Sequence, residues 1–227
     1  PNTIICIDWK GGGVAVETYS VTNDLTVCEV TTHAGGECAI YAYEEKSPLY
    51  VFSTNGIKMK DADLTNMKSL VLVNLTNSGL TDVKLPDSDD LAELILDKNN
   101  LTDIDLSRYA SQLRMLSLNN NQLTSFDASN MQNLLSLAIA NNQLTSLKLA
   151  NPDMYNLEAS GNQLTDIDLS KNKGLSQLFL SNNQLEHIDI KPLRSIVALH
   201  IDYNKFRIST LPILKNVSSY QYANQAN

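Results

Sequence analysis

The chain is poor in positive charge, in aromatic side chains and in long apolar segments, and these shortages exclude several classes of function. Of its 227 residues, 17 are Lys or Arg and 25 are Asp or Glu, which gives a formal net charge of -8. Surfaces that bind nucleic acid or an anionic membrane need clustered basic side chains, so the sequence predicts neither partner. No apolar run approaches the ~20 residues of a transmembrane helix, and we expect no membrane-spanning segment here.

Cysteine and histidine are equally scarce, with three residues of each. Cys6, Cys28 and Cys38 show no C-x-x-C spacing, and only His33 lies near them, so the sequence predicts no metal site. Buried free thiols are the favoured interpretation, and one disulfide with one thiol left over stays open. No histidine, serine or cysteine stands in a nucleophile elbow or an H-E-x-x-H motif, so we predict no catalytic residues and no cofactor.

What the sequence has in excess is a repeat of 20 to 22 residues built on leucine and asparagine. Each copy reads approximately L-x-x-L-x-L-x-x-N-x-L-T-x-I-D-L-S, as in residues 91–107. Seven copies begin, in order, at Leu70, Leu91, Leu113, Leu134, Met154, Leu175 and Ile196. Such a period is typical of a solenoid, in which repeats stack because one repeat alone cannot bury its leucines.

The leucine spacing also predicts the path of each repeat. In L-x-L both leucines point to the same side of a short strand, so stacked repeats form a parallel sheet, expected on the concave face. The I-D-L half alternates as well, which predicts a thin, extended return face with little helix. The aspartates of that half form a column that Lys84 and Lys148 interrupt, and we expect it to be solvated and not to bind calcium.

One asparagine recurs where each repeat leaves its strand. Its amide can donate to and accept from backbone groups that a turn leaves unpaired, so we predict a structural ladder through the stack. The ladder residues are Asn99, Asn121, Asn142, Asn162, Asn183 and Asn204, with Ser78 in the first repeat. Asn119 is expected to point outward and to contribute almost nothing to stability.

The segments N-N-Q-L-T-S-F-D-A and G-N-Q-L-T-D-I-D-L-S-K-N resemble the short leucine-rich repeats of internalin-like bacterial surface proteins. The most similar subclass is the ~21-residue form of Bacteroidetes cell-surface and lipoprotein-type proteins. This resemblance implies a mainly β, leucine-rich repeat solenoid that is non-catalytic and binds a protein or a glycan. It also implies export, either as an outer-membrane-anchored lipoprotein at the cell surface or to the extracellular space. Because the chain begins at Pro1, we expect that a leader has been removed.

The composition predicts three parts. Residues 1–69 hold every cysteine and the only tryptophan, and their β-branched and aromatic runs predict three to five antiparallel strands in a β cap or small β domain. The expected strands cover Thr3–Asp8, Val14–Val21, Leu25–Thr31 and Cys38–Tyr43. The repeats follow over residues 70–206, and residues 207–227 resemble the cap and tail that close such arrays. The oligomeric state stays open.

Outward positions on the concave strands differ between repeats, so they alone can encode a partner. Most are small or polar, and the exceptions are Ile95, Met115 and Phe179, with Tyr203 near the C-terminal end. The predicted ligand-binding set is Ile95, Met115, Glu158, Phe179, His200, Asp202 and Tyr203. We expect the binding face in the C-terminal half, where Phe179 and Tyr203 supply aromatic anchors. The low aromatic content favours a protein partner, while a glycan-binding accessory module or an architectural spacer stays open.

Overall fold

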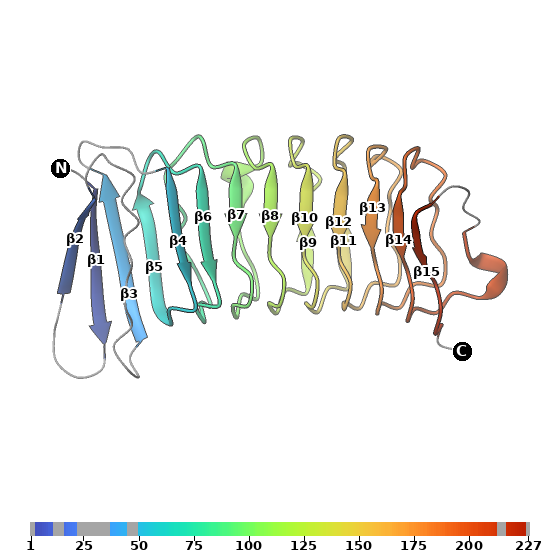
Figure 1. Cartoon of the computed structure of the whole chain (residues 1–227), viewed down its shortest axis with the longest axis horizontal. Helices are drawn as coiled ribbons and strands as arrows, with labels where there is room; N and C mark the ends of the chain where they lie inside the picture. The colour runs from blue at the N-terminus through green and yellow to red at the C-terminus, as the bar shows by residue number, and fades with distance from the viewer. Residues whose placement is uncertain (1–2, 11–15, 22–36, 45–49, 213–216, 226–227) are drawn as a thin grey trace. The chain divides into compact units, whose positions relative to one another are not determined.

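The computed structural model describes residues 3–10, 16–21, 37–44, 50–212 and 217–225. Contacts divide the chain into two compact units, Pro1–Leu101 and Thr102–Asn227, called here the N-terminal and C-terminal units (Figure 1). Within the described residues both units are β-structured, and the only helical elements are two 3₁₀ segments of three residues each, η1 (Ser107–Tyr109) and η2 (Ile208–Thr210). The predicted scarcity of helix is therefore confirmed.

The N-terminal unit begins with a four-stranded sheet of order β2-β1-β3-β5. Its strands are β1 (Thr3–Lys10), β2 (Val16–Val21), β3 (Glu37–Glu44) and β5 (Met59–Asn66). Strand β1 runs antiparallel to β2 and β3, whereas β3 and β5 are parallel. Three of the four predicted runs thus form strands, while Leu25–Thr31, with Cys28, lies outside the described residues. In the β1–β3 register Cys6 is opposite Tyr41 and not opposite Cys38.

The same unit contains three parallel repeat strands, β4 (Val51–Asn55), β6 (Leu72–Thr76) and β7 (Glu93–Ile95). Strand β4 belongs to a repeat that precedes Leu70 and that the alignment on leucine does not detect. Phe52 and Thr54 are buried there, opposite Val73 and Leu75 of the next repeat. An aromatic and a polar residue fill the two inward positions, and therefore the leucine signature is lost although the backbone path is kept.

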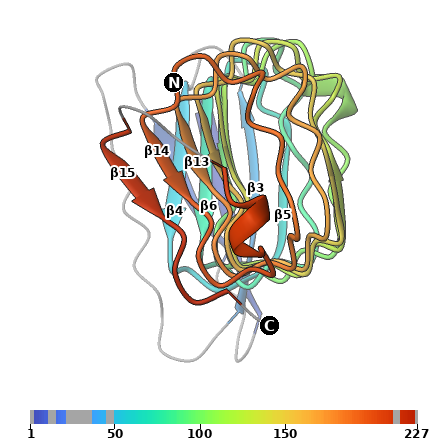
Figure 2. The same ribbon diagram turned by 90° about the vertical axis from the view of Figure 1, so that its right-hand side faces the viewer.

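The C-terminal unit contains six parallel strands in adjacent repeats, shown side by side in Figure 1. They are β8 (Met115–Ser117), β10 (Ser136–Ala138), β12 (Asn156–Glu158), β13 (Gln177–Phe179), β14 (Ala198–His200) and β15 (Ser219–Gln221). Two strands on the return side, β9 (Ser125–Asp127) and β11 (Ser146–Lys148), form a second parallel sheet. Figure 2 shows β13, β14 and β15 on one side of the repeats and the return segments opposite them. The repeat leucines between the two sides are almost fully buried.

The ladder asparagines join neighbouring repeats through the backbone. The Asn142 amide nitrogen donates to the carbonyls of Leu118 at 2.9 Å and Ile139 at 3.1 Å, and its Oδ1 accepts from the Leu123 N–H at 3.0 Å. The same pattern recurs at Asn99, Asn162, Asn183 and Asn204. Each side chain thus connects its own turn with the strand end of the preceding repeat.

The residue before each ladder position, and Gly56 at the equivalent place after β4, adopts a left-handed conformation, with φ between +54° and +77°. These residues are Gly56, Asn77, Lys98, Asn120, Asn141, Gly161, Asn182, Tyr203 and Asn224. Glycine and asparagine tolerate this region best, which explains why N-N and G-N recur at the end of the strand. Lys98 and Tyr203 depart from that preference.

Residues 217–225 add one more strand and one more ladder position at the point where the sequence predicts a closing segment. Strand β15 pairs in parallel with β14. Gln225 takes the ladder position: its Oε1 accepts from the N–H of Asn204 at 3.2 Å, and its Nε2 donates to the carbonyls of Ile201 at 3.1 Å and Tyr222 at 2.6 Å. The longer amide reproduces the contacts that asparagine makes in earlier repeats.

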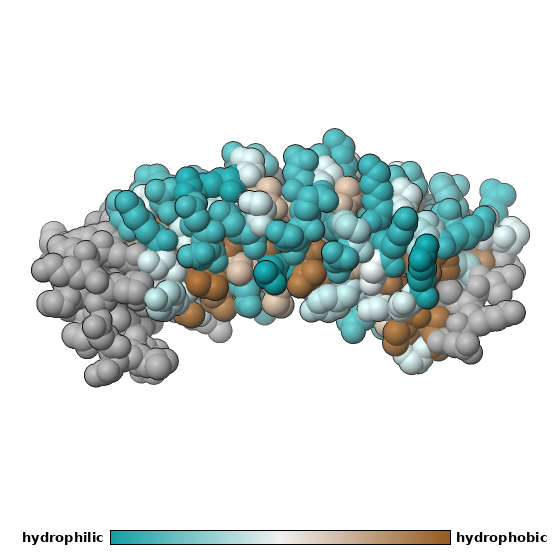
Figure 3. Space-filling view, turned by 90° about the horizontal axis from the view of Figure 1, so that it is seen from above, coloured by the Kyte–Doolittle hydropathy of each residue, from teal (hydrophilic) through white to brown (hydrophobic). Residues whose placement is uncertain are grey.

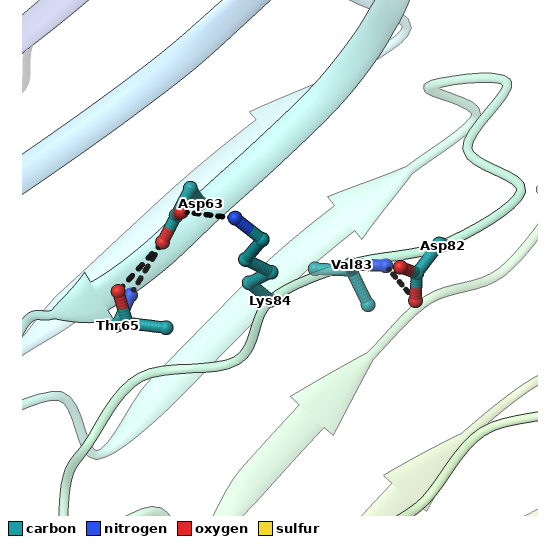
Figure 4. A network of polar contacts seen from close by, with 5 residues as sticks. All are labelled: Asp63, Thr65, Asp82, Val83 and Lys84. Atoms are coloured by element: carbon teal, nitrogen blue, oxygen red, sulfur yellow. Dashed lines mark hydrogen bonds and ion pairs between the residues drawn. The ribbon is translucent and has the colours of Figure 1, made fainter.

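On the return face the aspartates organise local turns. In the N-terminal unit, Asp63 accepts from the N–H and hydroxyl of Thr65 at 3.1 and 2.7 Å and pairs with Lys84 at 2.9 Å (Figure 4). In the C-terminal unit, Asp127 accepts from the hydroxyl and N–H of Ser129 at 2.6 and 3.0 Å, and these bonds lower the pKa of its carboxyl group. The recurring D-x-S/T spacing therefore serves the backbone of the return face.

Candidate binding face

The outward side of the parallel strands β8, β10, β12, β13, β14 and β15, with the residues that follow each strand, is called here the strand face. It carries six of the seven predicted binding residues. Glu158 on β12, Phe179 on β13 and His200 on β14 lie opposite one another in the parallel register, with Gln221 on β15 next to them. All three predicted residues are partly exposed. The one-repeat offset between equivalent positions brings side chains together that are about 21 residues apart in sequence.

Phe179 and His200 form the aromatic centre of the strand face. Their ring centroids are 4.8 Å apart with planes at 80°, which is an edge-to-face contact. His200 Nε2 also lies 2.7 Å from the hydroxyl oxygen of Ser219 on β15. Contacts with β13 on one side and β15 on the other therefore fix the imidazole ring.

The two carboxylates of the strand face are each oriented by one hydrogen bond. Glu158 accepts from the N–H of Ser160 at 2.9 Å, and Asp202 accepts from the hydroxyl of Ser181 at 2.5 Å. Neither carboxylate forms an ion pair with any residue that the structure describes. Their negative charge is therefore available to a partner.

Tyr203 follows Asp202 and occupies the left-handed position of its repeat, with φ +54°. Tyr203 is 52% exposed, so only part of its surface packs against the fold. A bulky residue is disfavoured there by about 1–2 kcal/mol relative to a right-handed position. The equivalent positions of the other repeats in this unit hold asparagine or glycine.

The remaining predicted residues lie away from this group. Met115 is 43% exposed on β8, which is separated from β13 by β10 and β12. Ile95 is partly exposed on β7 of the N-terminal unit. We therefore restrict the name strand-face cluster to Glu158, Phe179, His200, Asp202 and Tyr203.

Sequence reasoning missed the polar residues that hold the cluster in place. Ser181 and Ser219 are ordinary small residues in the repeat, and only the register shows that they bond Asp202 and His200. Sequence reasoning also missed a bond of Asn119, which was expected to contribute almost nothing to stability. Its Oδ1 accepts from the Ala140 N–H of the next repeat at 2.7 Å. Its position two residues after a central outward position could have suggested such a bond between repeats.

Seen from the edge of the repeats in Figure 3, the surface is mainly hydrophilic, with small separate hydrophobic patches. Large apolar or aromatic side chains that are well exposed among the described residues are Tyr50, Val51, Met115, Tyr155, Val197, Tyr203 and Tyr222. Tyr222 lies beside Tyr220, with ring centroids 4.8 Å apart. Burial, with a smaller contribution from Tyr222, raises the pKa of Tyr220.

The strand face offers an aromatic pair, two carboxylates and an imidazole–hydroxyl contact. His200 and Ser219 could form a base and nucleophile pair, but within the described part of the chain no carboxylate bonds the other ring nitrogen of His200 to orient it. Among the residues described, no group of three or more His, Cys, Asp or Glu side chains is arranged to hold a metal ion. In the same residues, no helix has the length and apolar character to cross a bilayer.

Comparison with solved structures identifies the architecture. InlF, an internalin from Listeria monocytogenes, superimposes with a TM-score of 0.58 and 22% identity over 76% of this chain and 61% of its own. The fold is that of the leucine-rich repeat proteins. InlJ of the same organism, whose functional domain includes a cysteine ladder, matches with a TM-score of 0.58 and 22% identity over 77% of this chain and 48% of its own. YopM from Yersinia enterocolitica matches with a TM-score of 0.55 and 20% identity over 73% and 40%.

The leucine-rich repeat chain spans about two fifths to three fifths of the length of these neighbours. No protein-family description matches it, and no curated protein matches it in sequence. The fold is thus shared with these proteins.

Proposed function

We propose that the chain is an exported, non-catalytic recognition module that binds a partner protein through the strand-face cluster. The observation that carries this proposal is the left-handed Tyr203 with its exposed ring. Backbone strain of this kind is kept where surrounding structure or function requires it, and it concentrates at sites of recognition. Every other repeat of the C-terminal unit avoids this strain with asparagine or glycine.

The neighbourhood of Tyr203 supports the same proposal. Phe179 and His200 offer a fixed aromatic surface, and two oriented carboxylates lie beside it. Aromatic residues ringed by polar groups are typical of the energetic centre of a protein interface. The motifs N-N-Q-L-T and G-N-Q-L-T, which resemble those of Bacteroidetes surface and lipoprotein-type proteins, favour a role at the cell surface or outside the cell.

The test compares the unchanged chain with the double variant Phe179→Ser and Tyr203→Asn. Both proteins are immobilised, exposed to extracellular proteins and applied in parallel to a glycan array. We expect a protein partner to be retained by the unchanged chain and lost by the double variant. A matched control, Tyr155→Asn, removes a 43% exposed tyrosine outside the cluster and should retain the partner.

Two outcomes would contradict the proposal. A partner that is retained equally by the double variant, or lost equally in the Tyr155 control, would mean that the cluster is not the binding site. Retention of specific glycans, with no protein retained, would instead establish the glycan-binding alternative. Circular dichroism of each variant shows that loss of binding does not reflect loss of the fold.

A further inference from the structure

We infer that the strand face selects a basic, extended segment of its partner, with two arginine or lysine side chains seated at Glu158 and Asp202. The inference rests on the proposed function and names the chemistry of what is bound. It starts from the distribution of charge over the outward positions of the C-terminal unit.

Outward positions of β8 to β15 and the two residues after each strand contain no Lys or Arg. In order along the unit they are Met115, Ser117, Asn119, Ser136, Ala138, Ala140, Asn156, Glu158, Ser160, Gln177, Phe179, Ser181, Ala198, His200, Asp202, Ser219, Gln221 and Ala223. The basic residues of the unit lie elsewhere, for example Arg108, Lys148 and Lys171. Among these positions, the acidic or basic residues other than His200 are Glu158 and Asp202.

The carboxylates of Glu158 and Asp202 can bind a cationic group of a partner. Each is held by a single hydrogen bond from a serine within its own repeat or the neighbouring one. Neither is neutralised by a basic residue in the described part of the chain, although return-face acids such as Asp127 do pair with a lysine. A partner that supplies positive charge gains an attraction that no internal group already satisfies.

Phe179 lies between the two carboxylates and completes the site. It is in register with Glu158 on one side and His200 on the other, and Asp202 follows two residues after His200. A guanidinium or ammonium group is attracted both to an aromatic face and to a carboxylate, and arginine stacks on aromatic rings most often.

The spacing of the carboxylates favours an extended segment. Glu158 and Asp202 are separated by two strand spacings across the sheet and by two residues along the strand. With about 4.8 Å between strands and about 3.3 Å per residue, their backbone positions lie roughly 12 Å apart. Residues i and i+4 of an extended peptide share one face and lie about 13 Å apart, so two basic side chains with that spacing match the site.

The same geometry disfavours other ligands. A metal ion needs ligands at about 2.0–2.6 Å, and among the described residues no group of three or more His, Cys, Asp or Glu side chains is arranged to supply them. Phosphate groups would be repelled by both side chains. The inference is thus specific to a cationic peptide segment.

The probe is the peptide acetyl-Arg-Ser-Gly-Ser-Arg-amide, and acetyl-Glu-Ser-Gly-Ser-Glu-amide serves as the charge-reversed control. Binding to the full chain is measured by titration calorimetry and by NMR shifts at low and high ionic strength. Glu158→Gln and Asp202→Asn should each weaken the arginine peptide about 2- to 5-fold, as expected for an exposed ion pair. Added salt should weaken it further. Asp153→Asn, an exposed carboxylate elsewhere in the unit, should leave its affinity unchanged.

The inference would be overturned if the arginine peptide fails to bind or if the glutamate peptide binds more tightly. It would also be overturned if Glu158→Gln and Asp202→Asn bind the arginine peptide as tightly as the unchanged chain does. If a partner protein is still lost from the Phe179→Ser and Tyr203→Asn double variant, only the basic character of the segment is refuted. If that partner is retained by the double variant, the proposal that the strand-face cluster binds a partner protein is refuted as well. The two proposals therefore fail in distinguishable ways.

Discussion

Replacing Asn142 by alanine tests whether the ladder stabilises the stack. The side chain makes four hydrogen bonds: its Nδ2 donates to the carbonyls of Leu118, Ile139 and Ala140 at 2.9, 3.1 and 3.2 Å, and its Oδ1 accepts from the Leu123 N–H at 3.0 Å. Asn142 is 8% exposed, so water cannot simply replace all of these bonds. We therefore expect a loss well above that of a surface substitution.

The magnitude follows from which groups lose their last partner. All three carbonyls retain another donor, namely the side-chain amides of Asn121 and Asn162 and the N–H of Asn120. The Leu123 N–H has no second acceptor among the described residues. One orphaned buried donor costs about 1–3 kcal/mol, and the weakened carbonyl contacts bring the expected loss of unfolding free energy to about 2–4 kcal/mol.

Urea denaturation of the unchanged chain, Asn142→Ala and Asn142→Asp measures this loss. The aspartate variant keeps an acceptor for the Leu123 N–H but turns a carboxylate oxygen toward the carbonyls, so it should be less stable than the alanine variant at neutral pH. Asn130→Ala, at an exposed residue whose side chain forms no hydrogen bond with described residues, is the control and should change stability little. Equal free energies for the Asn142 and Asn130 variants would refute the reasoning.

Three further predictions concern single positions of the C-terminal unit. Tyr203→Asn should raise the unfolding free energy by about 0.5–1 kcal/mol in a denaturant titration, because asparagine tolerates φ +54°; no gain would mean that the backbone there is not strained. Gly161→Ala, at φ +69° and against the neighbouring Asn141 side chain, should lower it by about 1–2 kcal/mol, and an unchanged melting curve would contradict this. The carboxyl of Asp127 has a lowered pKa in the folded state, so its contribution is present above the unfolded value near ~3.9 and is lost as pH falls below it. Asp127→Asn should therefore reduce the acid dependence of stability below about pH 4, and an unchanged acid profile would contradict this.

The repeat architecture was predictable because period and burial depend on local composition. Leucines at fixed spacing can be buried only by stacking, so the parallel strands and the thin return face follow from the sequence. The repeat around Phe52 and Thr54 was not predicted, because these two residues fill the buried positions that leucines occupy in other repeats. Gln225 was not predicted as a ladder residue, because the sequence pattern requires asparagine there. Its longer side chain bonds the equivalent backbone carbonyls.

The candidate site was predictable only in its residue types. Variation between repeats indicates that Phe179 and His200 are candidate binding residues. Their edge-to-face contact, however, depends on the strand register, which the sequence does not show. The Asn119 bond to the next repeat and the left-handed Tyr203 depend on backbone geometry that no single repeat reveals. Asn119→Ala is therefore expected to lower stability measurably, in contrast to the expectation from sequence alone.

The bonds between repeats also determine how the C-terminal unit bears a mechanical load. Its sheet and ladder hydrogen bonds link each repeat to the one before, with partners about 20 residues apart. A force that separates successive repeats therefore acts along these bonds and loads the successive junctions in series. The weakest junction opens first, and each opened repeat releases about 21 residues of chain, or roughly 70 Å when extended. Stretching should produce a series of small, equal steps, so that the unit yields gradually and does not break at once.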